Sequence, residues 1–450
     1  MILSATGPTQ DGALSFFEHI AINHLTEYHH NTSWKTSLMF FSQTSPSVRC
    51  ATTALALIHQ QYANQDARGP VRTPISGHLQ VKEIALTYYN KAIQLLLGDQ
   101  HSDSTQTMAV TLLVCYLFTC FDHLAGNHTQ AVRHLHGGVQ LIRNLQQDMD
   151  NNHHGLGDKF PPLIRQVSRQ IRRLDMQAVL FLVDWTPAAL EEDLTPQIHH
   201  LQNAYQSLEQ AAEQMSDLIS RVMILRNAGQ QAAIANRQVQ APLMPEVGLR
   251  TQLKAWFVRW EKTLQQRTGN AALKTTSLIS MTLVQYAMAE ILLNTHGAGR
   301  EMDYDLYLPR FEECLALVEE IMAMRENHSG WSAPTFTPEI GILPVLHIIG
   351  VKCRHPLVRR KARDILRQRR LREAVWDSVS TVAIIQRVIE IEEGGSGQVT
   401  TVVDMESIGI WQRVETISWV HVVSEYDAGR LDVTYQFCGQ EEVHEESLPL

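Results

Sequence analysis

The chain has 450 residues, of which 44% are hydrophobic and 7% aromatic, and this is the composition of an ordinary globular protein. Its 38 Lys and Arg residues against 47 Asp and Glu residues give a formal net charge of −9, which argues against a surface built as a whole to bind nucleic acid. The six cysteines form no CxxC pair and predict free thiols in a reducing compartment, the nucleus or the cytoplasm.

No membrane partner is expected from the sequence. The longest apolar stretch, from Met108 to Phe121, is shorter than the roughly 20 residues that a spanning helix needs. The N-terminus also lacks the basic, apolar and small-residue order of a secretory leader.

Most of the chain shows the three- and four-residue apolar spacing of amphipathic helices. The predicted helices cover, in chain order, about 81–96, 102–126, 129–145, 162–183, 196–236, 247–266, 271–295, 304–326, 343–353, 358–369 and 375–392. The short connection Gly126-Asn127 makes the helices on either side antiparallel neighbours, and Gly137-Gly138 predicts a close helix–helix contact. We therefore expect a mostly α fold, a multi-helix bundle or solenoid-like body.

The pattern changes after Glu393. The segment Gly394-Gly395-Ser396-Gly397 has the composition of a flexible linker. Two β-branched and aromatic runs, 414–425 and 430–437, then predict a small hairpin around Asp427-Ala428-Gly429. The acidic end, 440–446, is predicted to be frayed. We expect two domains, a helical domain over 1–393 and, over 394–450, a linker, hairpin and acidic tail that pack on the helical body.

Several short motifs occur along the chain, and their order as a set is more specific than any one of them. They are Leu14-Ser15-Phe16-Phe17, Trp34, Ala54-Leu55-Ala56, Tyr89, the run 112–122 with Gly126-Asn127, Lys352-Cys353-Arg354-His355-Pro356, Arg359-Arg360-Lys361-Ala362 and Trp376-Asp377. Together, over roughly residues 11 to 438, they resemble the regulatory domain of fungal binuclear zinc-cluster transcription factors.

This resemblance implies a transcription regulator or co-regulator in the nucleus. Its helical domain is expected to bind a small-molecule effector and a protein partner, either a full-length transcription factor or a second copy. The six-cysteine zinc cluster of that family is not recognisable, because no cysteine precedes Cys50 and zinc needs clustered ligands. We therefore expect indirect DNA contact, no metal and no cofactor. If the protein is fungal, a secondary-metabolite gene cluster is the expected target.

Two other interpretations remain open. The scaffold could be reused as a small-molecule-binding protein or a biosynthetic enzyme, or the sequence could be a truncated gene model whose first exon is missing. An in-frame six-cysteine motif upstream of Met1 would establish truncation.

The segment 352–372, called here the basic segment, contains ten Lys or Arg residues and one acid, Asp364. It could serve as a nuclear localisation signal or contact phosphates. The candidate residues are Arg359, Arg360, Lys361, Arg363, Arg369 and Arg370. The favoured alternative is that Arg359, Arg360, Arg363, Arg367 and Arg370 pair with acidic helices, such as those containing 312–326 and 390–393.

One cluster has the residue types for acid–base chemistry. Asp122 and His123 follow Cys120, and His134 is expected opposite them across the helical hairpin. A helix-packing or capping role for Asp122 is the favoured alternative. Because no phosphate loop, nucleophile elbow or zinc-ligand spacing occurs, we expect no enzymatic activity.

Overall fold

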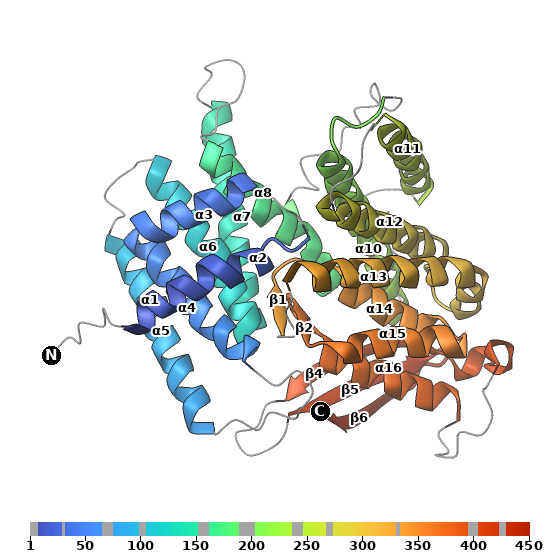
Figure 1. Cartoon of the computed structure of the whole chain (residues 1–450). Coiled ribbons are helices and arrows are strands. Elements are labelled where there is room, and N and C mark those ends of the chain that lie inside the picture. Colours follow the sequence, from blue (N-terminus) through green and yellow to red (C-terminus); the bar gives the residue numbers. More distant parts are fainter. Residues whose placement is uncertain are drawn as a thin grey trace.

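A computed structural model describes residues 8–28, 32–64, 75–98, 105–151, 162–188, 203–235, 246–266, 273–329, 334–394, 404–422 and 429–450. The fold is mostly α, as the sequence predicts, and its strands form two small three-stranded sheets. The N-terminal helices form one body in Figure 1, and the later helices and the C-terminal sheet form the other.

The N-terminal body consists of helices up to residue 180. They are α1 (Pro8–Phe16), the π-helical η1 (Phe17–Ala21), α2 (Ile22–His24), α3 (Thr32–Thr44), α4 (Pro46–Ala63), α5 (Ile75–Gly98), α6 (Thr105–Ala125), α7 (His128–Asn151), α8 (Pro162–Gln177) and the 3-10 turn η2 (Ala178–Leu180). Pro46 opens α4, where its missing N–H costs nothing. Gly126, with φ +81°, allows the chain to leave α6 and begin α7 after two residues.

The second body begins with α10 (Leu208–Ala235), α11 (Glu246–Gln265), α12 (Leu273–Asn294), the 3-10 helix η4 (Glu301–Tyr307) and α13 (Leu308–Ser329). It continues with α14 (Ile342–Lys352), α15 (Pro356–Gln368) and α16 (Ser378–Glu392). The prediction of a helix from 196 is wrong at its start, because residues 203–207 are not helical and α10 begins at Leu208; residues 189–202 lie outside the described part.

A first small sheet was not predicted from the sequence. Strands β1 (Thr335–Thr337), β2 (Leu371–Glu373) and β3 (Trp376–Asp377) form it, with β1 parallel and β3 antiparallel to β2. Strands of two or three residues are too short to show an alternating pattern. The predicted helix from 375 therefore begins at Ser378, where the Asp377 carboxylate accepts from the Ser380 N–H at 3.0 Å and caps α16.

The C-terminal sheet contains β4 (Val414–Val422), β5 (Arg430–Phe437) and β6 (Val443–Pro449), in that order. The predicted hairpin is confirmed in β4 and β5, whereas the predicted frayed end is wrong. Strand β6 pairs with β5, and its Glu446 carboxylate lies 2.8 Å from the guanidinium of Arg387 on α16. Most of the predicted linker and turn fall in 395–403 and 423–428, outside the described residues.

Two hydrophobic clusters make up the core. The first contains Trp34, Tyr116 and Phe121 of the N-terminal body, and the second contains Trp256 and Trp260 together with the sheet residues Val414, Leu431 and Val433. The C-terminal sheet therefore packs into the core of the second body.

The predicted close contact at Gly137-Gly138 is confirmed for one of the two glycines. A Cβ at Gly138 would lie 3.1 Å from Ile171 of α8, whereas a Cβ at Gly137 would meet nothing within 4 Å.

Two helical segments, Gln106–Ala125 and Thr276–Asn294, are long and apolar enough to cross a membrane. Both are mostly buried inside the protein, as the core helices of a globular protein are.

Candidate functional site

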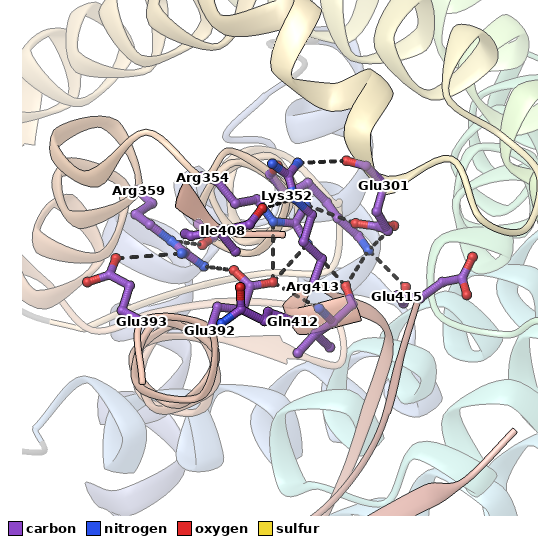
Figure 2. Close-up of polar contacts among 12 residues, drawn as sticks. Glu301, Lys352, Arg354, Arg359, Glu392, Glu393, Ile408, Gln412, Arg413 and Glu415 are labelled. Carbon is purple, nitrogen blue, oxygen red and sulfur yellow. Dashed lines mark hydrogen bonds and ion pairs between the residues drawn. The ribbon is translucent and has the colours of Figure 1, made fainter. Parts of the chain in front are cut away.

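The basic segment forms the end of α14, all of α15 and the start of the first sheet. Figure 2 shows that its side chains meet carboxylates from α16 and η4. Arg354 and Arg359 each donate an Nη2–H, at 2.8 Å, to a different oxygen of the Glu392 carboxylate. All three side chains are buried, so they form a closed ion-pair unit in the interior.

A second carboxylate, Glu301 of η4, extends this unit. The Lys352 ammonium donates to Glu301 at 2.7 Å and to the backbone carbonyl of Val414 at 3.1 Å. The guanidinium of Arg354 lies 2.8 Å from the other Glu301 oxygen. Because the Val414 N–H also donates to Glu392 at 2.9 Å, the network joins η4, α14, α16 and β4 (Figure 2).

Burial alone would raise the pKa of Glu392, but the charges of Arg354 and Arg359 outweigh it and hold the pKa below its usual value. Arg413, directly before the C-terminal sheet, is buried and pairs at 2.7 Å with Asp305, whose carboxylate is partly exposed. These buried charges are matched by partners, as an interior of low polarity requires.

The predicted pairing of the basic segment with acidic helices is confirmed for Arg359 and Arg360, whereas Arg363 and Arg367 pair with Asp364 of their own helix. Besides the Arg359–Glu392 pair, Arg360 pairs with Glu393 and Lys361 with Glu319 at 2.9 Å. The guanidinium of Arg363 donates to Gln386 at 2.7 Å and lies 2.7 Å from Asp364.

As candidates for phosphate or import-receptor contact, the six residues therefore differ. Arg359 is fully buried and cannot offer its guanidinium to a phosphate, which removes it from the predicted set. Lys361 is exposed, whereas Arg360, Arg363, Arg369 and Arg370 are half-buried. A role in nuclear import stays a prediction for these five.

The structure brings together two of the three acid–base candidates, Asp122 and His134. The Tyr89 hydroxyl on α5 donates to Asp122 Oδ2 at 3.1 Å and lies 2.5 Å from His134 Nε2. The histidine nitrogen is itself 3.6 Å from Asp122 Oδ2. Tyr89 stacks on Phe118 with ring centroids 3.8 Å apart, which fixes its position.

This Tyr89–Asp122–His134 cluster can hold a proton near neutral pH. Burial raises the pKa of Asp122 to about 6, although hydrogen bonds from Tyr89 and Asn127 act in the opposite direction. Burial also lowers the pKa of His134. Sequence reasoning missed Tyr89 as a site residue, because a tyrosine on the apolar face of a predicted helix has the pattern of a core residue.

His123 has different neighbours. Its ring is tilted against that of His128, the first residue of α7, with ring centroids 5.8 Å apart, and it lies near Arg372 of β2. Burial, together with the neighbouring charges of His128 and Arg372, lowers the pKa of His123 to about 3. His123 therefore belongs to the junction between the two bodies.

Among the residues that the structure describes, no group of three or more His, Cys, Asp or Glu side chains could hold a metal ion. The cysteines Cys50, Cys120, Cys314, Cys353 and Cys438 are buried free thiols, and Cys115 is half-buried.

No family model matches the sequence, and no solved structure matches it. The chain is similar to a curated protein of Emericella nidulans, the aspercryptin biosynthesis cluster-specific transcription regulator atnN. The two are 22% identical over 439 residues, which cover 78% of this chain and 68% of the relative. This similarity supports a relationship to fungal transcription regulators and, in general terms, a role in transcription regulation.

Proposed function

We propose that this chain is a nuclear transcription regulator of a biosynthetic gene cluster. The observation that carries the proposal is the similarity to a cluster-specific regulator along 78% of the chain. Short motifs shared in order along the sequence support the same relationship.

DNA contact is proposed to come through a partner, either a full-length transcription factor or a second copy of the chain. The net charge of −9 opposes a polyanion, and Arg359, Arg360 and Lys361 of the basic segment are engaged by Glu392, Glu393 and Glu319. The helical body then serves as the surface that binds the partner and a small-molecule effector.

The test is deletion of the gene in the source organism, followed by measurement of transcripts from the neighbouring biosynthetic genes. A regulator is expected to change the transcript levels of several of these genes together, and reintroduction of the intact gene restores them. If the metabolite is lost while all transcripts stay at their normal level, the proposal is wrong and an enzymatic role is supported.

One observation favours that second candidate function. The Tyr89–Asp122–His134 cluster combines a carboxyl group whose pKa is about 6 with a partly exposed imidazole, a pairing suited to general acid–base chemistry. Complementation with Asp122→Asn distinguishes the two roles. An enzyme is expected to lose metabolite production with transcripts unchanged, whereas a regulator that carries this variant, if folded, keeps both.

A further inference from the structure

Two histidines, His123 and His128, and one arginine, Arg372, lie close together at the N-terminus of α7. His128 is the first residue of this 24-residue helix, and the first N–H groups of a helix have no acceptor within it. Together with the helix dipole they favour a negative charge at this end. The His123 ring, only 3% exposed, lies beside it at 5.8 Å from the His128 ring.

Three buried polar atoms at this place lack a hydrogen-bond partner among the described residues. They are Nδ1 of His123, Nδ1 of His128 and Nε of Arg372. Leaving a buried polar group unsatisfied costs about 1–3 kcal/mol, and folded proteins rarely tolerate several such groups in one place. The grouping therefore indicates that something polar fills it.

Arg372 differs from its neighbours in the basic segment. Its Nη1–H donates to the backbone carbonyl of Leu124 at 2.9 Å, which holds the guanidinium beside α6. Among the described residues, however, no carboxylate lies within ion-pair distance of it, whereas Arg354, Arg359 and Arg360 all have one.

The nearest acid in this region is already engaged. The Asp377 carboxylate accepts from the Ser380 N–H at 3.0 Å and from the Ser380 hydroxyl at 2.7 Å, and it lies 3.1 Å from His421 Nε2. Burial would raise the pKa of Asp377, but the hydrogen bond with His421 and the charge of Arg372, its cross-strand neighbour in the first sheet, hold the pKa well below its usual value. Arg372 is thus near this carboxylate without an ion pair to it among the described residues, and its Nε keeps no acceptor there.

We propose that a small oxyanion, a carboxylate or a phosphate, binds at the N-terminus of α7 between Arg372, His123 and His128. A guanidinium edge can donate two parallel N–H bonds to such a group, and each neutral imidazole can donate one more from Nδ1. The site would join the N-terminal body to the first small sheet. It is independent of any role in transcription, although it is suited to an acidic effector.

Calorimetric titration of the whole chain with inorganic phosphate, and separately with malonate, tests the site at constant ionic strength set by chloride. We expect saturable binding of one anion per chain, and the tighter of the two identifies the class. Arg372→Gln is expected to weaken binding at least tenfold. Lys361→Gln, which removes the same charge from an exposed position of the basic segment, is the matched control and is expected to leave it unchanged.

His128→Gln provides a second variant that does not touch the Arg372 anchor, and we expect it to weaken binding severalfold. If the wild-type chain shows no saturable binding of either anion, the groups are satisfied by water and the proposal is wrong. It is also wrong if Lys361→Gln weakens binding as much as Arg372→Gln, or if His128→Gln has no effect.

Discussion

Glu392 is the residue on which the buried charges of the second body converge. Its carboxylate accepts from Arg354, Arg359 and the Val414 N–H, and none of these groups is exposed to water. A buried ion pair adds little net stability relative to an apolar replacement, but removal of one partner leaves the other charge uncompensated. The residue is therefore expected to be essential to the fold.

Glu392→Gln is expected to lower the free energy of unfolding by about 3–5 kcal/mol, because two buried guanidinium groups lose the carboxylate charge that they share. Glu390→Gln is the matched control, since Glu390 lies on the same helix with an exposed side chain, and it is expected to change stability by about 0.5 kcal/mol or less. Urea unfolding with an unchanged slope measures both. Equal stabilities of the two variants would contradict the assignment.

Because the pKa of Asp122 is raised in the folded protein, its titration is expected to make the free energy of unfolding depend on pH. Its pKa is raised to about 6 in the folded protein, against about 3.9 in an unfolded chain. The folded state therefore holds the extra proton between these values, and this group makes the protein more stable as pH falls from 7 towards 4. Asp122→Asn removes the effect, so the wild type is expected to gain stability relative to the variant between pH 7 and pH 5.

His123 acts with the opposite sign. Its pKa, lowered to about 3, lies below the value of about 6.5 in the unfolded chain, so this group makes the folded state less stable as pH falls below 6.5. Comparing urea midpoints of the wild type and Asp122→Asn at both pH values cancels this common contribution. A difference between them that does not change with pH would show that Asp122 has an ordinary pKa.

At the scale of elements, the C-terminal sheet completes the second body. Val414, Leu431 and Val433 are buried in its core, and the Val414 backbone supplies partners to Glu392 and Lys352. Burial of three such aliphatic side chains contributes several kcal/mol at about 1.5–3 kcal/mol each.

A chain that ends at Gly394 is therefore expected to aggregate or to melt at a clearly lower temperature than the full chain. A chain that ends at Gln440 loses only β6 and the Arg387–Glu446 pair, and its melting temperature is expected to fall less. Differential scanning calorimetry measures both. If the shorter chain stays soluble and melts like the full chain, the sheet does not contribute to the core.

The elements that could be predicted from the sequence are those with a long repeating pattern. Helices such as α6 and α7 show their apolar spacing over many residues, and β4 and β5 show β-branched runs with a turn between them. Strands β1 to β3 could not be found, because each has only two or three residues. The pairing of β1 with β2 also joins segments that are far apart in the chain.

The contacts at the candidate sites also include some that could be predicted from the sequence and some that could not. The ion pairs of Arg359 and Arg360 were predicted, because an acidic run at 390–393 lies close in sequence to a basic one. The contributions of Glu301 and Arg413 were not, since an isolated charge carries no local signal of its partner. The junction of His123 with Arg372 joins residues 249 positions apart and could be found only from the structure.

At the scale of the whole molecule, an aromatic side chain from each body is buried in the hydrophobic cluster of the other body. Tyr28 follows α2 in the N-terminal body but is buried in the second hydrophobic cluster, and Phe336 of β1 is buried in the first, with its ring 5.7 Å from that of His59. Strands β1 and β2 lie between the two bodies in Figure 1.

The buried carboxylate of Glu373 holds the Tyr28 side chain in the second body. The Tyr28 hydroxyl donates to Glu373, whose carboxylate also accepts from the N–H groups at the start of α14, at 2.8 Å from Gly341 and 3.0 Å from Leu343. The guanidinium of Arg325 lies over the Tyr28 ring at 4.5 Å. Because these contacts cross the junction, we expect the two bodies to unfold together.

Tyr28→Ala tests this coupling. Hydrogen exchange read by mass spectrometry at increasing urea gives separate midpoints for α6, in the first body, and α12, in the second. In the wild type the two midpoints are expected to coincide, as in a cooperative unit. Tyr205→Ala removes a buried ring from the second cluster without touching the junction, so it is expected to lower both midpoints together.

Tyr28→Ala removes a ring of the same size from the same cluster, but it also deletes the hydrogen bond to Glu373 and the contact with Arg325. The loss of coupling is then expected to separate the two midpoints, because each body keeps its own core and only the contacts between them are weakened. Separate midpoints already in the wild type would mean that the bodies are independent. Coincident midpoints in Tyr28→Ala, as in Tyr205→Ala, would place the coupling in other contacts across the junction, such as the Arg173–Glu339 pair at 3.0 Å.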